Sequence, residues 1–398
     1  MPSSRFSTWP CYSEEEVQCA AAVIRSNDVN YWTGQEGRKF ENEFAAWTGA
    51  SHAIALTNGT VALDLALHGL GIGSQNGGAG TDEVIVTPRT FIASVSCVVN
   101  AGAIPVFADV DNDSGNLSAE TISAVLTPCT KGVIVVHLAG WPCGMDEILE
   151  LAERHNLKII EDCAQAHGAR ISGRAVGTFG DVGAWSFCQD KIMTTGGEGG
   201  MVTTKDEKLW SKMWSFKDHG KSWDAVYKRS HQPGFRWLHE SFGTNWRMLE
   251  TQAAIGRLQL QKMAEWTEQR TRNALAIAEF LAEFSDAVRV PAPSDNVVHA
   301  YYRQYAYVKT EGLNTDWTRD RIVSEISSLG VPVFHGTCSE VYLEKAFDQT
   351  GWRPVKSLPV AKKLGQTSLM FLTHPTLTSN EINLIGDAIR QVLTKASV

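Results

Sequence analysis

Short apolar runs alternate with amphipathic segments from about residue 54 to residue 205. Runs rich in Val, Ile and Phe between polar or turn-forming residues predict strands at 83–87, 104–110, 132–138, 157–163, 182–187 and 200–204. Segments with apolar residues three and four positions apart predict helices at 60–70, 91–102 and 145–156. This alternation predicts an α/β fold with a mostly parallel sheet covered on both faces. Ligands of such sheets bind beyond the carboxyl ends of the strands, so functional residues are expected just after strands.

The remainder of the chain has a different pattern. Residues 217–247 are polar and aromatic without a clear period, which predicts a long functional or disordered loop. Residues 248–284 are strongly helical and predict one long helix or a broken pair. From about residue 300 the pattern predicts a small α+β unit, and the Pro and Ser cluster at 291–296 predicts a hinge. We therefore expect a large domain over 1–285 and a small C-terminal domain over 286–398.

Composition narrows the class of protein. The 398 residues are 43% apolar and 20% charged, as expected of a soluble globular protein. The net charge of −8 is spread along the chain without a basic block, which argues against a nucleic-acid partner. The eight cysteines include no C-x-x-C pair, so free thiols are expected and no metal site is predicted. Because no signal segment or bilayer-length apolar stretch is present, we expect a cytoplasmic protein with no membrane partner.

Asp162 is the first candidate for chemistry, because it ends the apolar run 157–163 and should lie in the ligand crevice. A carboxylate there requires a cationic or protonated partner. A salt bridge or a helix cap explains it equally well in isolation. Gln165 lies near the same place if the chain turns helical after Asp162.

The second candidate is the turn at Asn58, Gly59 and Thr60, where a strand ends and a helix begins. Free N–H groups and the positive helix end suit a phosphate. An ordinary strand-to-helix turn uses the same residues.

The third candidate is the stretch "SFCQDKIMTTGGEGG". Ser186 lies near the end of a strand, Lys191 follows it, and the glycines beyond permit positive φ and close backbone approach. A lysine held in such surroundings can act as a Schiff-base nucleophile, whereas the alternative is a solvated surface lysine.

The three candidates together are typical of a site for pyridoxal 5′-phosphate (PLP). PLP needs a lysine for its aldehyde, an acid for its pyridine nitrogen and donors for its phosphate. The phosphate turn, the acid and the lysine occur in that order along the chain.

The ordered motifs "NGT", "EDCAQAHGA", "WSFCQDKIMTTGGEGGMVTT" and "GTNWRMLETQAAIGRLQL" resemble the DegT/DnrJ/EryC1/StrS family of nucleotide-sugar aminotransferases, from about residue 6 to the C-terminus. The resemblance implies the fold type I (aspartate aminotransferase-like) architecture and homodimers with active sites at the subunit interface. It implies that Lys191 forms the Schiff base and moves the proton, and that Asp162 pairs with the pyridine nitrogen. The remaining implied cofactor contacts are Gln165 near the ring, Gly59, Thr60 and Ser186 at the phosphate, Phe91 against the ring, and Asn245 reaching the phosphate from the neighbouring subunit.

Two departures from the family pattern stand beside Lys191. The glycine run "TTGGEGG" has one glycine more than the commoner form, and "CQD" replaces the frequent "HP" before the lysine. Neither removes a catalytic group. Relatives with histidine in place of the lysine act as dehydratases, so Lys191 favours transamination.

The resemblance implies that L-glutamate donates the amine and leaves as 2-oxoglutarate, with pyridoxamine 5′-phosphate as the aminated cofactor. A nucleotide-linked keto-sugar then accepts the amine, and "GTCSEVYLEKAF" favours C-4 of a 4-keto-6-deoxy hexose. Amination at C-3, a PLP-dependent sugar dehydratase and a non-catalytic PLP-binding regulator are the alternatives. Trp32, Arg247 and His335 are candidate substrate contacts. Arg247 could instead brace the subunit interface, and His335 could be an ordinary core or surface histidine.

Overall fold

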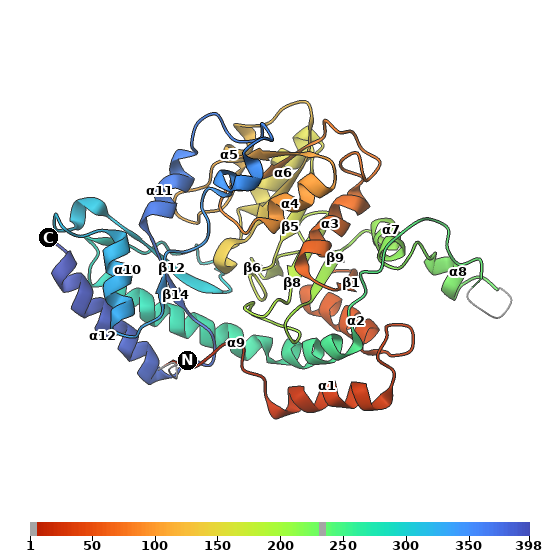
Figure 1. Cartoon of the computed structure of the whole chain (residues 1–398), viewed down its shortest axis with the longest axis horizontal. Helices are drawn as coiled ribbons and strands as arrows, with labels where there is room; N and C mark the ends of the chain where they lie inside the picture. Colours follow the sequence, from red (N-terminus) through yellow and green to blue (C-terminus); the bar gives the residue numbers. More distant parts are fainter. Residues whose placement is uncertain (1–5, 231–235) are drawn as a thin grey trace.

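The computed structural model describes residues 6–230 and 236–398. Its largest sheet has seven strands, and β9 is the single strand antiparallel to its neighbours. Figure 1 shows this sheet at the centre of the larger part of the molecule. The strand order is β1 (His52–Leu56), β9 (Gly200–Thr204), β8 (Val182–Ser186), β5 (Lys158–Asp162), β4 (Thr130–Val136), β2 (Glu83–Val86) and β3 (Ile104–Phe107). The predicted mostly parallel sheet is confirmed, and all six predicted strands occur in it.

Helices bury both faces of this sheet. Successive side chains of a strand point to opposite faces, so alternate residues of each strand belong to different hydrophobic cores. Ile54 and Leu56 pack with α3 (Gly59–Leu70), α4 (Ala93–Asn100) and α7 (Glu207–Lys217). Ala53 and Ala55 pack instead with α2 (Glu36–Thr48) and α9 (Glu250–Ala282). Farther along the same face, α5 (Ala119–Ser123) and α6 (Met145–His155) cover β2, β4 and β5. The predicted helices at 60–70, 91–102 and 145–156 are therefore confirmed as the covering layers.

The segment 248–284 forms one unbroken helix, α9, rather than a pair. It packs against α1 (Glu14–Ser26) and α2 near its start and against α12 (Ser379–Ala396) near its end, as Figure 1 shows. Ala253 and Met263 belong to a core of the large part, whereas Ile277 and Leu281 belong to the C-terminal core. One helix thus joins the two cores.

The C-terminal part is α+β, as predicted. An antiparallel sheet in the order β10 (Val288–Arg289), β12 (Arg303–Val308), β14 (Ser368–Leu372), β13 (Val333–Phe334) packs on α10 (Arg319–Ser328) and α12. A further helix, α11 (Pro359–Thr367), lies beside β12. The domain boundary at residue 285 stays a prediction.

The segment 291–296 has no helix or strand but is tied to the large part. The carbonyl of Asn296 accepts a hydrogen bond from the Ser172 N–H at 2.7 Å. The next strand, β11 (Val297–Val298), then pairs with β6 (Arg170–Ile171), which is joined to β7 (Arg174–Ala175). These contacts restrain the predicted hinge.

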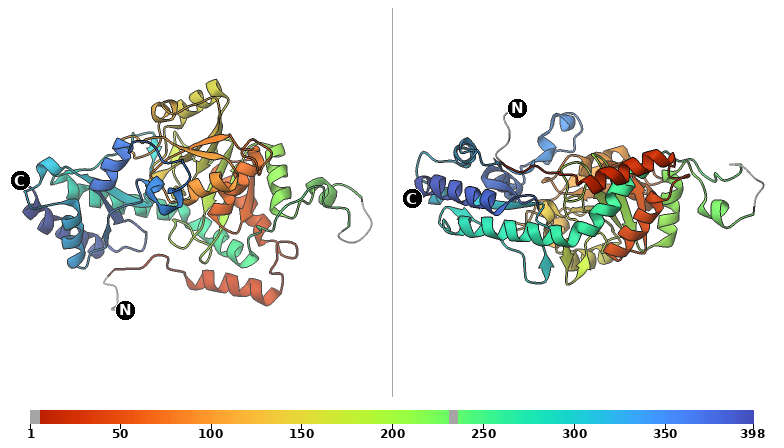
Figure 2. Two further views of the ribbon diagram at one scale, coloured as in Figure 1. Left: turned by 45° about the horizontal axis from the view of Figure 1, so that its top comes forward. Right: turned by 90° about the horizontal axis from the view of Figure 1, so that it is seen from below.

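The predicted loop 217–247 contains a short helix, α8 (Trp223–Tyr227), whose start is capped by the Ser222 side chain at the Ala225 N–H. The absence of a period concealed it because five residues complete little more than one turn. Figures 1 and 2 agree that α8 projects away from the body of the molecule. Residues 231–235 of this loop and 1–5 of the N-terminal segment lie outside the described residues.

The described chain contains no helix that combines the length and apolar character needed to cross a membrane. All eight cysteines are free thiols, and Cys97 and Cys163 in the predicted apolar runs are buried.

Phe44 lies at the centre of an aromatic group on the α2–α9 face, fully buried among Phe40, Trp47, Trp185 and Phe187. We predict that Phe44→Ala lowers the free energy of unfolding by about 3–5 kcal/mol, because it removes ring contacts and leaves a cavity. Urea unfolding of the cofactor-free protein, at one protomer concentration, measures the change. The control Val355→Ala changes an exposed side chain and should stay within about 0.5 kcal/mol of the parent. Equal losses in both variants would contradict the packing argument.

Candidate active site

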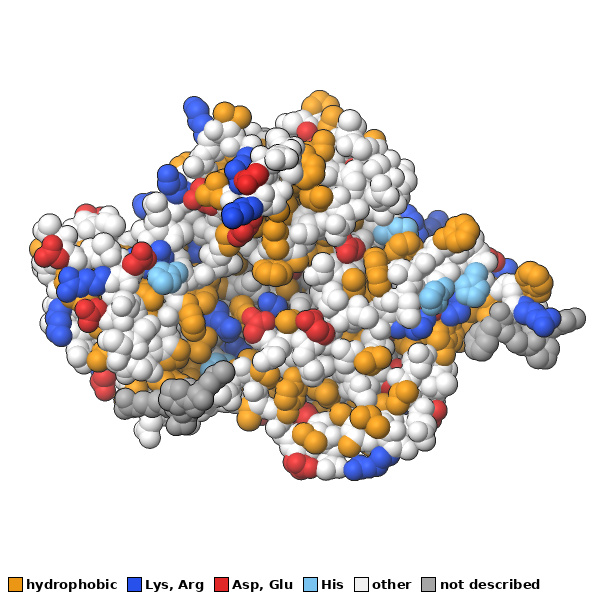
Figure 3. Space-filling view, viewed as in Figure 1, with side chains coloured by type: hydrophobic (Ala, Val, Ile, Leu, Met, Phe, Trp, Pro, Cys, Tyr) orange, Lys and Arg blue, Asp and Glu red, His pale blue; other side chains and the backbone are white. Residues whose placement is uncertain are grey.

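A cavity of about 730 Å³ opens at the carboxyl ends of β5 and β8. Figure 3 shows a hollow near the middle of the face in view, where acidic and basic side chains lie close together. The predicted residues that line the cavity are Gly59, Thr60, Phe91, Asp162, Gln165, Ser186 and Lys191. The structure thus brings together seven of the eight residues predicted to contact the cofactor.

Asp162 ends β5 and is buried at the floor of the cavity. The Ser94 hydroxyl donates to Oδ2 at 2.8 Å, and the Ala164 N–H donates to Oδ1 at 3.1 Å. Burial raises the pKa of this carboxyl, and the two hydrogen bonds and the charge of Lys191 oppose the rise only in part. Within the described residues Asp162 forms no salt bridge and caps no helix, so neither of its ordinary structural roles is observed.

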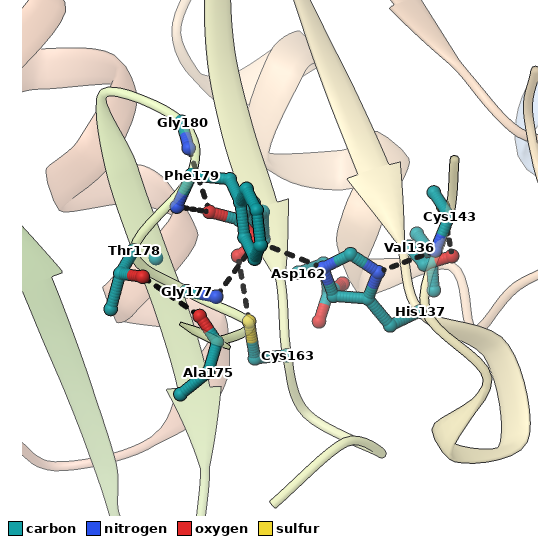
Figure 4. A network of polar contacts seen from close by, with 12 residues as sticks. Val136, His137, Cys143, Asp162, Cys163, Ala175, Gly177, Thr178, Phe179 and Gly180 are labelled. Carbon is teal, nitrogen blue, oxygen red and sulfur yellow. Dashed lines mark hydrogen bonds and ion pairs between the residues drawn. The ribbon is translucent and has the colours of Figure 1, made fainter. Parts of the chain in front are cut away.

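A second buried carboxylate, Glu161, precedes Asp162 on β5, and Figure 4 shows the network of polar contacts around this strand end. It accepts hydrogen bonds from the N–H groups of Gly177, Phe179 and Gly180, each at 2.7 Å. The Nε2 of His137 lies 3.1 Å from Glu161, and the Nδ1 of His137 accepts from the Cys143 N–H at 3.0 Å. Because Nδ1 is an acceptor, Nε2 carries the proton and donates to Glu161. His137, Glu161 and Cys163 lie close enough together to hold a metal ion. These bonds already engage both His137 nitrogens and both Glu161 oxygens.

The start of α3 forms an anion cradle. Asn58 Oδ1 accepts from the Val61 N–H at 3.0 Å and so caps the helix. No acceptor among the described residues faces the N–H groups of Gly59 and Thr60. A Cβ on Gly59 would lie 2.5 Å from the Cβ of Ser186, so only glycine allows the hydroxyl of Ser186 to approach this turn. Free donors, a helix N-terminus and a hydroxyl therefore converge at one point.

Lys191 lies in the loop between β8 and β9, which backbone hydrogen bonds close. The Phe187 N–H donates to Gly199, and the Gln189 N–H donates to Gly197. Gly196 and Gly197 both have positive φ, +82° and +124°, so the additional glycine in "TTGGEGG" serves a turn that disfavours other residues. The Lys191 side chain is only 17% exposed, which excludes a solvated surface lysine.

Two further contacts hold Lys191 in place. The indole Nε1 of Trp9 donates to the Lys191 carbonyl at 2.8 Å. Asp190, from the unusual "CQD", lies with Oδ1 3.6 Å from the Lys191 Nζ. The lysine is therefore fixed through both its backbone and its side chain.

The model of the DegT/DnrJ/EryC1/StrS aminotransferase family matches residues 10–390. The chain belongs to this family. Members of the DegT/DnrJ/EryC1/StrS family depend on PLP, and the cavity fits that cofactor on three counts. It offers free N–H groups for a phosphate, a buried carboxylate for a ring nitrogen and a shielded lysine for an aldehyde. The family therefore identifies the chain as a PLP-dependent aminotransferase.

Relatives in the family match almost end to end. The GDP-perosamine synthase of Caulobacter vibrioides is 38% identical over 95% of this chain and 98% of that protein. The UDP-N-acetyl-3-dehydro-α-D-glucosamine 3-aminotransferase of Acidithiobacillus ferrooxidans is 35% identical over 92% of this chain and 91% of its own. The X-ray structure of the aminotransferase from Psychrobacter cryohalolentis is 59% identical with a TM-score of 0.95, covering 98% of this chain and 99% of that one.

Four of the predicted site residues do not line the cavity: Asn245, Trp32, Arg247 and His335. Asn245 is exposed and pairs through its backbone with Asp218. Arg247 donates from Nη1 to Asp218 at 2.7 Å. Trp32 packs against the core beside Lys221, whose Nζ is 4.3 Å from its ring centroid. His335 is 56% exposed and lies 3.5 Å from Asp320.

Several lining residues were missed by the sequence analysis. Ser94, which holds Asp162, lies on α4, and Asp190 is adjacent to Lys191. Tyr302 and Arg303 enter from the C-terminal part at the start of β12. In the sequence, only the unusual "CQD" and the polar positions in "YYRQY" point to these residues. Neither stretch shows that its side chains face the cavity.

Asp162 yields a prediction for stability. The pKa of Asp162 in the folded protein lies above the ordinary value of 3.8 that it has in the unfolded chain. Between these two pKa values the unfolded chain ionises first, so the free energy of unfolding falls as the pH rises. An asparagine can accept from Ala164 and donate to the Ser94 oxygen without charge. We predict that cofactor-free Asp162→Asn is more stable than the parent at pH 7 and that the difference shrinks as the pH falls toward 3.8.

Thermal unfolding of the two cofactor-free proteins across this pH range measures the difference. Asp113→Asn, at an exposed position, is the control and should show no comparable gain. A destabilised Asp162→Asn at pH 7 would refute the sign of the pKa argument.

Proposed function

We propose that the protein transfers an amino group from L-glutamate to the keto group of a nucleotide-linked sugar. One observation carries the proposal: Lys191, Asp162 and the α3 anion cradle meet in a single cavity. The names of the relatives support the acceptor class, because a GDP-sugar synthase and a UDP-sugar aminotransferase both match over nearly the whole chain. PLP, when bound, supplies the electron sink that makes the substrate Cα–H bond labile.

The proposed roles follow from position. Lys191 would hold the cofactor through its aldehyde and would serve as the acid and base that moves the proton during transfer. Asp162 keeps the ring nitrogen protonated, and Ser94 keeps Asp162 pointed into the cavity. Gly59, Thr60 and Ser186 receive the phosphate.

Two further residues are proposed to flank the cofactor ring. Phe91 lines the cavity and is 68% exposed, so its ring is free to lie against a cofactor ring. Gln165 accepts from the Ala139 N–H at 2.8 Å through Oε1, which leaves its amide N–H₂ to face the ring oxygen.

We propose that a homodimer completes the site, with Asn245 entering from the neighbouring subunit. Asn245 is exposed and lies outside the cavity of its own chain, as this arrangement requires. In the same segment Trp237 and Phe242 are 87% and 99% exposed, so both rings are available to a partner subunit. Arg247, braced on Asp218, would position this segment at the interface.

We propose C-4 of a 4-keto-6-deoxy hexose as the aminated position. The segment that favours this position begins at Gly336 and Thr337, and both line the cavity. The Thr337 N–H donates to the Tyr305 hydroxyl at 2.9 Å, which holds the segment against β12. C-3 amination is the second candidate, because the Acidithiobacillus ferrooxidans relative is named a 3-aminotransferase.

A panel of 3-keto and 4-keto nucleotide sugars with L-glutamate tests the reaction. We expect a 4-amino sugar from a 4-keto-6-deoxy substrate, identified by mass spectrometry and NMR, with 2-oxoglutarate formed in equal amount. A 3-amino product would establish the second candidate. Failure to aminate any member of the panel, by an enzyme whose cofactor still reacts with glutamate, would overturn the proposed acceptor class.

Hybrid dimers test the shared site. Lys191→Ala and Asn245→Ala should each be inactive alone, because each homodimer lacks one group in both of its sites. After unfolding and refolding together, about one quarter of the parent activity should return, because half of the dimers then hold one intact site. Mixing Lys191→Ala with Asp162→Asn is the control and should restore nothing, since both groups belong to one subunit's cavity. Equal recovery in both mixtures, or none in either, would contradict the contribution of Asn245 across the interface.

A further inference from the structure

Two cationic side chains line the cavity among the described residues, Lys191 and Arg303. Both lie over the ring of Tyr302: the Lys191 Nζ is 5.3 Å from its centroid, and the Arg303 Cζ is 4.0 Å from it. The Tyr302 ring is therefore a common neighbour of Lys191 and Arg303 in the cavity.

The Arg303 guanidinium has unused donors. Its Nη1 donates to the Tyr302 carbonyl at 2.8 Å. No described carboxylate lies within ion-pair distance of Arg303, and no described acceptor faces its Nε or Nη2. A partly buried guanidinium with free donors in a cavity is a site for an anion, and its planar fork matches a carboxylate.

The carboxylates of the cavity are engaged elsewhere. Asp190 accepts from the Tyr302 hydroxyl through Oδ2 and lies beside Lys191 through Oδ1. Burial opposes its ionisation, but Lys191, the Tyr302 hydroxyl and Arg303 outweigh burial and lower the pKa of Asp190. Asp162 is held by Ser94 and Ala164, and Glu198 accepts from the Cys188 thiol. None of these groups forms an ion pair with Arg303.

We infer that Arg303 binds a carboxylate of the amino donor. The inference rests on the proposed function, in which an amino acid and a nucleotide sugar use the cavity in turn. In an amino acid, the carboxylate is bonded to the carbon that carries the reacting amine, so its anchor must lie close to Lys191. In a nucleotide sugar, the diphosphate is bonded to C-1, across the ring from a 4-keto carbon. The position of Arg303 beside the Lys191–Tyr302 pair fits the first anion.

Binding of glutarate, a dicarboxylate without an amine, tests this inference without any turnover. Isothermal titration calorimetry on the cofactor-loaded protein should show about 10- to 100-fold weaker glutarate binding in Arg303→Gln, because charge-assisted hydrogen bonds are lost. Arg303→Lys keeps the charge without the fork and should fall between Arg303→Gln and the parent. Arg390→Gln is the control, since Arg390 is exposed and paired with Glu283. The visible absorption of bound cofactor checks that each variant folds.

A parallel titration with pyrophosphate separates the two anions. Loss of glutarate binding with pyrophosphate binding unchanged supports the inference. Unchanged glutarate binding, or a larger loss for pyrophosphate than for glutarate, would overturn it and point to the diphosphate. Neither measurement uses a keto-sugar, so failure of the proposed acceptor class leaves this test intact.

Discussion

The cavity depends on how one strand end buries two adjacent carboxylates. Glu161 and Asp162 point to opposite sides of β5, because side chains alternate along a strand. Glu161 is satisfied by three backbone N–H groups and His137, which fixes the strand end and the turn at 177–180. Asp162 receives fewer hydrogen bonds, so burial raises its pKa and leaves it suited to a protonated partner. Glu161 thus stabilises the strand end, whereas its neighbour Asp162 is left to face the cavity.

The sheet could be predicted because strands buried on both faces appear as apolar runs, and the chain shows six of them. Asp162, Lys191, Gly59 and Ser186 could be predicted because each ends or follows a strand, or opens a helix, at the same edge of that sheet. For these four residues, the position at a strand end or helix start, which the sequence shows, is enough to place the side chain at the cavity.

The residues that sequence analysis missed depend on contacts distant in sequence. Tyr302 and Arg303 reach the cavity because the Tyr302 N–H donates to the Ala139 carbonyl at 2.8 Å, which ties the start of β12 to the large part. Glu161 and Asp162 are both acidic, and they differ only in the face of β5 toward which each side chain points. The residue types alone therefore do not show which of the two faces the cavity. The additional glycine is explained only by the backbone, because Gly196 and Gly197 both have positive φ in one turn.

The indole of Trp9 connects the N-terminal segment to the Lys191 loop across 182 positions of sequence. Its ring packs edge-on against Trp266 of α9, at 5.1 Å between centroids. The segment before α1 therefore braces the Lys191 loop against α9 through this one indole. The exposed Val398 ends the chain on the same C-terminal part whose core buries Phe6, so a tag after Val398 would displace fewer packed side chains than a change near Phe6.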